Sequence, residues 1–489
     1  MRQFDPGDGP GGRFGTNGGP GGRVPRRDAV TGPPGRGSMD ERARRLGNES
    51  FRADFGVDYA YAAGSMYRGI ASKELVVAMG RAGFLAFLGA AGLSPDRVGE
   101  DIAHIRRRLA PHRSFGVNLL ADFRDPARET ANVERLLAHG VCVVEASAFV
   151  KVTPALVQFH LRGLRTGRDG TVARDTRILA KVSRPEVARE FMRPASPDLV
   201  ARLLAEGRVT PEQAGLAAHV PVAQDLTVEA DSGGHTDRGV ATALLPAMQS
   251  LRQRLSREFG YAEEIRLGLA GGIGTPQAVA AAFVLGADYV MTGSINQCTV
   301  EAGISDAVKD RLQGIDVQDT DYCPAGDMFE MGALVQVLRK GALFPARANR
   351  LLALYRTYDA WEEIPEGVRR QLQETFFKKS VDEVWRETCD YLRRTGRDAE
   401  IERAERTPKR KMAHIFRWYY GYSSRLSFTD PERDPANVQV HTGPALGAFN
   451  QWVRGTDLEN WRNRHPDRMA RQLLEEAATI LAEQRKVFS

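Results

Sequence analysis

Short apolar runs alternate with amphipathic segments between about residue 57 and residue 295. Apolar runs bounded by glycine or proline predict buried strands, and apolar residues that recur with a helical period predict helices. The runs that predict strands are Tyr59–Ala63, Phe84–Gly89, Phe115–Leu120, Val141–Ala146, Ile178–Val182, Val222–Glu229, Ile265–Ala270 and Tyr289–Thr292. Segments between them that predict helices include Pro126–Ala138, Pro154–Leu164, Arg238–Phe259 and Pro276–Leu285. Eight strands that alternate with helices favour a closed (β/α)8 TIM barrel over an open sheet.

The two ends of the chain differ from this middle part. Residues 1–45 are rich in Gly, Pro and Arg and bury too little apolar surface to offset chain entropy, so we expect a disordered arm. The strand pattern fades after the last run, and residues 329–489 predict a mainly helical appendage. Its expected helices include Ala333–Lys340, Ala346–Tyr358, Val381–Arg394 and Arg468–Lys486. The barrel is therefore expected to span residues 50–328.

Composition and charge narrow the class of protein. With 42% hydrophobic and 27% charged residues the chain is typical of a soluble protein. No apolar run approaches the roughly 20 residues that a membrane helix needs, and we expect no secretory signal and a cytoplasmic location. The four cysteines lie far apart, which indicates reduced thiols and no metal site. A net charge of +6 suits a solvated basic surface or an acidic partner, and no base-reading motif favours nucleic acid.

In a barrel of this class, functional residues gather on the loops that follow the carboxyl ends of the strands. Here those loops contain polar, charged and glycine residues that would meet at one rim. They are Ala63-Gly64-Ser65-Met66, Asn118, Glu145-Ala146-Ser147, Lys181, Asp231-Ser232-Gly233-Gly234-His235, Gly271-Gly272-Ile273-Gly274 and Thr292-Gly293-Ser294.

Two of these residues carry charge or protons. His235 stands on a tight Gly-Gly turn beside acidic residues, which indicates a catalytic acid or base, although a structural polar role has the same pattern. Lys181 lies inside an apolar strand, where an unpaired charge is costly, so it requires an anionic partner. That partner is either a reduced flavin ring or a structural ion pair with Glu145 or Glu229.

The glycine turns indicate an anion site. Gly271-Gly272-Ile273-Gly274 lacks the spacing of a dinucleotide fingerprint, but it precedes a helix start at Thr275-Pro276. With Thr292-Gly293-Ser294 it would form a phosphate cradle in the barrel, and two ordinary βα turns are the alternative. Gly64 and Asn118 likewise fit either a cofactor contact or a turn and a backbone cap.

Taken together, the motifs resemble the PfaD family. Glu229-Ala230-Asp231-Ser232-Gly233-Gly234-His235-Thr236-Asp237 is similar to the flavin-barrel signature of nitronate monooxygenases and FMN-dependent enoyl reductases. The further PfaD-like motifs are Phe51-Arg52-Ala53-Asp54, Tyr67-Arg68-Gly69-Ile70-Ala71-Ser72, Glu145-Ala146-Ser147-Ala148-Phe149, Ala180-Lys181-Val182-Ser183-Arg184-Pro185-Glu186-Val187, Thr292-Gly293-Ser294-Ile295-Asn296-Gln297, Asp327-Met328-Phe329-Glu330, Phe416-Arg417-Trp418-Tyr419 and Gly443-Pro444-Ala445-Leu446-Gly447-Ala448-Phe449-Asn450. The resemblance covers about residues 50 to 455. It departs at Val440-His441-Thr442, where the family more often has an aromatic residue and a cysteine.

The resemblance implies an enoyl reductase that works in trans with a polyketide or polyunsaturated fatty acid synthase. It implies FMN as cofactor, NADPH or NADH as electron donor, and an unsaturated acyl thioester on an acyl carrier protein as substrate. His235 would flank the flavin and is a candidate proton donor. The implied FMN contacts are Ala63, Gly64, Asn118, Lys181, Gly271, Gly272, Gly293 and Ser294. The alternatives are a nitronate monooxygenase and a non-catalytic synthase component that binds a carrier protein.

Overall fold

Eight parallel strands form a closed barrel in the computed structural model, which describes residues 36–123, 125–168 and 170–488. Around the barrel the order is β1-β11-β10-β8-β7-β4-β3-β2. The bounds are β1 (Tyr61–Ala63), β2 (Leu85–Leu88), β3 (Gly116–Leu120), β4 (Val143–Ser147), β7 (Arg177–Val182), β8 (Asp225–Glu229), β10 (Arg266–Ala270) and β11 (Tyr289–Thr292). Each predicted strand overlaps one of these, so the predicted TIM barrel is confirmed.

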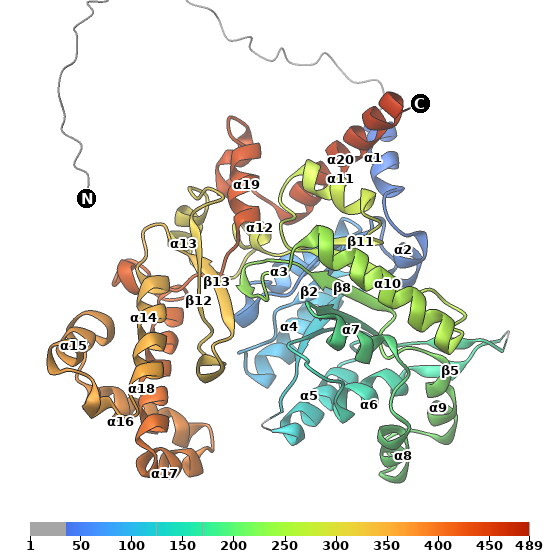
Figure 1. The fold of residues 1–489 in the computed structure, drawn as a ribbon. Helices are drawn as coiled ribbons and strands as arrows, with labels where there is room; N and C mark the ends of the chain where they lie inside the picture. The colour runs from blue at the N-terminus through green and yellow to red at the C-terminus, as the bar shows by residue number, and fades with distance from the viewer. Residues whose placement is uncertain (1–35, 124, 169, 489) are drawn as a thin grey trace, which may run out of the picture.

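Helices surround the barrel (Figure 1). They are α3 (Lys73–Arg81), α4 (Pro95–Arg108), α5 (Pro126–Ala138), α6 (Pro154–Arg162), α7 (Pro185–Met192), α8 (Pro197–Ala205), α9 (Pro211–Leu216), α10 (Ala241–Phe259) and α11 (Pro276–Val284). Several begin with proline, whose fixed φ and missing N–H suit the first helical position. In α4, α5, α6 and α11 the preceding Ser, Asp or Thr side chain also accepts a backbone N–H, and these caps set where the helices start.

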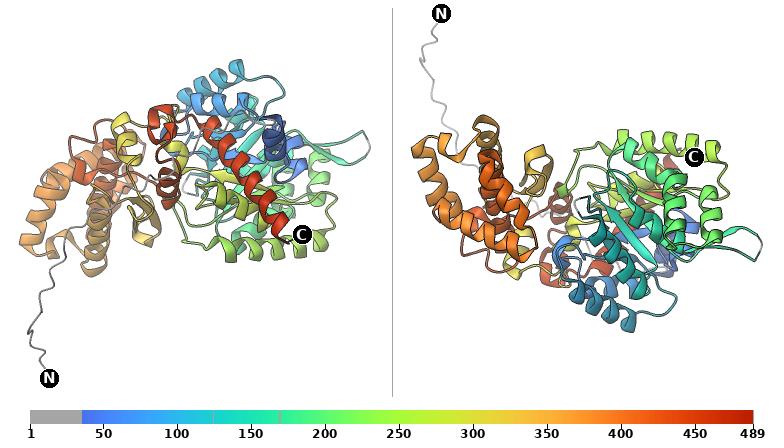
Figure 2. Two further views of the ribbon diagram at one scale, coloured as in Figure 1. Left: turned by 90° about the horizontal axis from the view of Figure 1, so that it is seen from above. Right: turned by 90° about the horizontal axis from the view of Figure 1, so that it is seen from below.

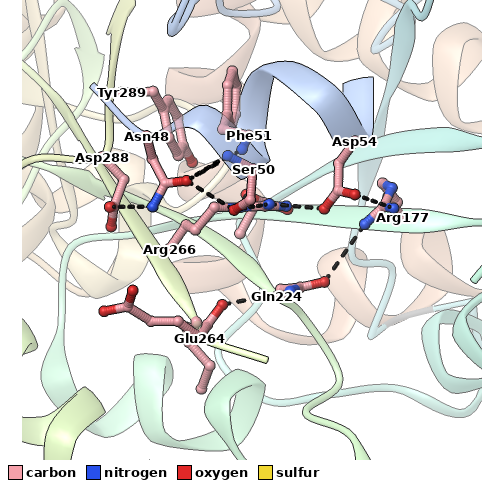
Figure 3. Close-up of polar contacts among 12 residues, drawn as sticks. Asn48, Ser50, Phe51, Asp54, Arg177, Gln224, Glu264, Arg266, Asp288 and Tyr289 are labelled. Carbon is pink, nitrogen blue, oxygen red and sulfur yellow. Dashed lines mark hydrogen bonds and ion pairs between the residues drawn. The ribbon is translucent and has the colours of Figure 1, made fainter. Parts of the chain in front are cut away.

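A polar and aromatic plug closes the amino-terminal end of the barrel. Helix α2 (Glu49–Phe55) buries Phe51, whose ring stacks on Tyr289 with 4.3 Å between centroids. Asp54 of this helix accepts a hydrogen bond of 2.7 Å from Arg266 and forms an ion pair of 2.9 Å with Arg177 (Figure 3). Arg266 also forms two hydrogen bonds, of 2.7 and 2.8 Å, with Asp225 at the start of β8. This end of the barrel is therefore sealed, and the opposite end is the one open to chemistry.

Part of the expected amino-terminal arm forms a helix. The expectation of disorder for residues 1–35 lies outside the described residues. Residues within the expected arm form α1 (Arg36–Arg44), which packs against α20 (Pro466–Phe488). Arg471 of α20 donates to Asp40 at 2.9 Å, so α1 is tied to a helix from the far end of the chain.

Two small antiparallel sheets lie outside the barrel. One is the hairpin of β5 (Leu164–Thr166) and β6 (Val172–Arg174). The other has the order β12-β13-β9, with β12 (Thr320–Pro324), β13 (Leu334–Leu338) and β9 (Gly234–His235). The predicted helix Ala333–Lys340 is therefore wrong, because Leu334–Leu338 is a strand. A short apolar run carries little period of its own, and its pairing with β12 and β9 decides the conformation.

The carboxyl-terminal region is mostly helical, as predicted. Helices α14 (Phe344–Thr357), α15 (Glu366–Gln371), α16 (Val381–Arg394) and α18 (Pro408–Leu426) surround a separate aromatic core with β12 and β13, and α17 (Asp398–Arg406) packs on α16 and α18. They stand to one side of the barrel (Figures 1 and 2). Helix α20 returns to the barrel and packs on α11, and α19 (Pro444–Trp452) contacts α12 (Ser294–Gln297). Across the part of the chain that the structure describes, no helix is both long and apolar enough to cross a bilayer.

Candidate active site

The predicted site residues meet at the carboxyl-terminal rim of the barrel. Ala63 ends β1, Asn118 lies in β3 and Lys181 lies in β7. The turn with Gly271 and Gly272 follows β10, and the turn with Gly293 and Ser294 follows β11, while Gly64 directly follows β1. Because all eight strands are parallel, these positions share one end of the barrel, opposite the plug.

Lys181 lies at this end of the barrel close to two carboxylates, those of Glu229 and Glu145. The Nζ atom of Lys181 lies 3.1 Å from Oε1 of Glu229, so Glu229 is one anionic partner of this lysine, as one of the predicted alternatives had it. Burial lowers the pKa of Lys181, but the charges of Glu229 and Glu145 outweigh it and raise that pKa well above its usual range. Burial raises the pKa of Glu145, against the charge of Lys181. The lysine therefore stays charged, and 18% of its side chain remains exposed to the rim.

Glu145 is also held by the neighbouring loops. Both of its carboxylate oxygens lie 3.3 Å from the backbone N–H of Ser65, and the Ser65 hydroxyl donates to it as well. Asn118 donates from Nδ2 to the Glu145 carbonyl at 3.4 Å and to Oγ of Ser147 at 3.1 Å. Asn118 thus ties β3 to β4, which is the capping role that the sequence left open.

The glycines of the two turns differ in how much space surrounds them. A Cβ at Gly271, where φ is +90°, would lie 2.7 Å from backbone atoms of Ala230 and Asp231, so this residue must be glycine. A Cβ at Gly272 or at Gly293 would meet no atom within 4 Å. Gly271 is therefore packed tightly against the β8 loop, while Gly272 of the same turn and Gly293 of the second turn each face unfilled space.

The carboxyl-terminal region supplies a further wall that sequence reasoning did not assign to the site. A Cβ at Gly233 would lie 2.6 Å from the Thr442 carbonyl carbon and 2.8 Å from Oγ of Ser294, and one at Gly274 would lie 2.1 Å from the Ala445 oxygen. Residues 442–445, at the amino-terminal end of α19, therefore lie directly against the loop after β8 and the glycine turn after β10. The Gly443-Pro444 pair was part of a motif that resembles the family, but the motif alone did not indicate that these residues border the site.

His235 stands at the edge of this rim. Its Nε2 atom lies 2.9 Å from Oδ1 of Asp327, and 52% of its side chain is exposed. Burial opposes the charged form of His235, but the hydrogen bond and charge of Asp327 outweigh it and raise its pKa. His441 lies nearby and packs against the ring of Tyr67, and burial lowers its pKa to about 4. Neither Asp327 nor His441 was predicted as a site residue, because both come from distant segments.

Comparison with known proteins identifies the family. Residues 51–327 match the family described as nitronate monooxygenase. The chain belongs to the nitronate monooxygenase family. Residues 358–437 of this family member match a second family, the inserted helical domain of acyl-carrier-protein S-malonyltransferase. That segment corresponds to the helices from α15 to α18.

Relatives of this nitronate monooxygenase family member include a polyketide biosynthesis protein and a component of a polyunsaturated fatty acid synthase. It is 49% identical over 441 residues to the polyketide biosynthesis protein PksE of Bacillus subtilis, covering 90% of this chain and 57% of PksE. It is 43% identical over 417 residues to one component of the polyunsaturated fatty acid synthase of Thraustochytrium sp., covering 85% of this chain and 28% of that component. The chain thus spans little more than half of the first relative and less of the second.

A solved structure matches nearly end to end. The enoyl reductase domain of MlnA, from the macrolactin biosynthesis cluster of Bacillus amyloliquefaciens, superposes with a TM-score of 0.87 at 41% identity. The match covers 91% of this chain and 99% of that domain. The resemblance to PfaD-like proteins within the nitronate monooxygenase family is therefore confirmed.

Backbone strain in this family member concentrates on the rim. Arg68, Ala148 and Arg238 have positive φ angles of 54°, 60° and 55°, and they lie on the loops after β1, β4 and β8. Left-handed backbone is unfavourable for residues with a Cβ and persists where the surroundings over-determine it. Among the described non-glycine residues with positive φ, these three lie on rim loops and Lys378 lies in the carboxyl-terminal region.

Proposed function

We propose that this chain is an FMN-dependent enoyl reductase that acts in trans. It reduces α,β-unsaturated acyl thioesters carried by an acyl carrier protein during polyketide or polyunsaturated fatty acid biosynthesis, with NADPH or NADH as electron donor. The match over 99% of the MlnA enoyl reductase domain supports this proposal most strongly. The synthase relatives and the segment similar to a helical domain of acyl-carrier-protein S-malonyltransferase support a carrier-bound substrate.

The rim residues fit FMN. Gly272 and Gly293 each face unfilled space, tight packing requires Gly271 beside Gly272, and the Ser294 hydroxyl lies close to Gly233. These residues would hold the phosphate, and Lys181 would place a positive charge beside the flavin ring, where a cation favours the reduced form. When bound, FMN would supply the hydride-transfer chemistry, and these residues would hold it.

The remaining task of the protein is to deliver a proton and to orient the thioester. His235 is half exposed, lies near the ion pair of Lys181 and Glu229, and has a raised pKa. A protonated His235 would donate a hydrogen bond to the thioester carbonyl or a proton to the α-carbon, and its exposure allows it to be reprotonated from solvent.

Anaerobic turnover tests the proposal. The purified protein is expected to bind FMN and to oxidise NADPH or NADH when a crotonyl thioester of an acyl carrier protein is supplied. His235→Ala should lower turnover about 100-fold and retain FMN, because general acid catalysis contributes at least that factor. A protein that binds FMN but leaves the thioester unreduced with either nicotinamide would refute the proposal.

The second candidate is nitronate monooxygenase activity, which the family match over residues 51–327 favours. Oxygen uptake with an alkyl nitronate, together with no reduction of the crotonyl thioester, would establish it instead. The helical segment 358–437 is the feature that argues for a carrier-bound substrate.

A further inference from the structure

The segment of residues 320–338, which contains β12 and β13 and lies outside the barrel, pairs with the backbone around His235. Strand β13 pairs with β9, with Val335 opposite His235 and Gln336 opposite Gly234. The backbone N–H of the next residue, Thr236, donates to the carbonyl of Leu334 at 3.1 Å. The histidine is therefore held as part of the small sheet β12-β13-β9 rather than as a free loop of the barrel.

The same segment also holds the ring. Asp327 lies between β12 and β13, and its Oδ1 is 2.9 Å from Nε2 of His235. Arg417 of α18 donates to the Asp327 carbonyl at 3.0 Å and forms an ion pair with Glu330, which anchors this turn to the helical region. An ionised carboxylate only accepts hydrogen bonds, so Nε2 must carry a proton. The atom left for substrate is Nδ1.

Four charged or titratable groups surround the imidazole. Asp327 and Glu229 favour its charged form, whereas Lys181 disfavours it. The fourth group, His441, lies across Gly234 and stays neutral near pH 7 because burial lowers its pKa to about 4. Among these groups Asp327 is the one in hydrogen-bond contact with His235.

We propose that Asp327 is a positioning residue that keeps Nε2 of His235 protonated and presents Nδ1–H to the substrate. This rests on the proposed enoyl reduction. As the β-carbon receives hydride, the Nδ1–H bond breaks, the α-carbon takes that proton, and the neutral imidazole keeps its Nε2–H bond to Asp327. A proton from solvent then restores the charged ring.

Titration of His235 by NMR tests the positioning role without turnover. His235→Ala identifies the signal, and Asp327→Asn removes the charge while keeping an acceptor oxygen. The matched control is Asp321→Asn, on β12 of the same segment, where the carboxylate accepts the backbone N–H of Tyr322 at 2.8 Å. We expect the pKa of His235 to fall in Asp327→Asn and to stay unchanged in Asp321→Asn. An unchanged pKa in Asp327→Asn would overturn the proposal.

The pH profile of turnover gives the second readout. Because charged His235 donates the proton, activity is lost as pH rises through its pKa, and a lower pKa moves that loss to lower pH. We expect Asp327→Asn to lose about tenfold in kcat at pH 8 and little at pH 5.5, and Asp327→Glu to recover much of the loss. An equal loss at every pH would overturn the proposal. If the wild-type protein reduces no enoyl thioester but the NMR shift appears, the proposed function fails and the positioning role of Asp327 stands.

Discussion

Removing one charge from the plug at the closed end of the barrel should destabilise the protein strongly. In Asp225→Asn, the two hydrogen bonds of 2.7 and 2.8 Å that Arg266 forms with the carboxylate lose their charge, and an amide N–H₂ group faces the guanidinium. Both side chains are almost fully buried, at 0% and 1% exposure. Breaking such a pair costs about 3–5 kcal/mol, and the remaining ion pair of Arg266 with Asp54 places the expected loss near about 3 kcal/mol.

Thermal unfolding measures this loss. With an unfolding entropy of about 2.1 cal/mol/K per residue over 489 residues, each kcal/mol shifts Tm by about 1 °C, so Asp225→Asn should lower Tm by about 3 °C. The matched control is Asp175→Asn, which breaks an exposed pair with Arg165 and should cost less than about 1 kcal/mol. If both variants unfold at the same temperature, the plug does not depend on its buried charges and the reasoning is wrong.

Three further predictions concern the rim. Lys181→Met leaves Glu229 without its ion pair, and absorbance titration should show FMN affinity lowered about tenfold or more. Gly293→Ala places a methyl group in open space, so it should leave Tm within about 1 °C and weaken FMN binding. Gly271→Ala should lower Tm because its methyl group would meet backbone atoms. Equal Tm values for the two variants would contradict the packing argument. His441 has a folded pKa of about 4 against 6.5 unfolded, so stability should fall as pH drops from about 6.5 to 4, and His441→Gln should reduce that slope in Tm measured against pH.

The barrel was predictable because its signals are local. Each strand, such as Tyr289–Thr292, is an apolar run bounded by turns, and several of the following helices begin with a proline and a capping side chain. The rim residues followed from the same rule, since a residue such as Lys181 at a strand end must face the open end of a parallel barrel.

The missed features depend on contacts between distant segments. Asp327 meets His235 across 92 positions of sequence, and neither residue has a local pattern that predicts the other. The strand Leu334–Leu338 has a run of apolar residues that suits a helix as well, and only its partners in β12 and β9 decide. Gly443, which directly precedes α19, was part of a recognised motif, but its contact with Gly233 could be found only from the fold.

Helices α1 and α20 lie side by side on the barrel, joined by the contact of Arg471 with Asp40 (Figure 1). The chain therefore enters and leaves this fold at neighbouring points, on the side that α11 covers. A fold with adjacent entry and exit can be inserted into a longer polypeptide without forcing its flanking modules apart.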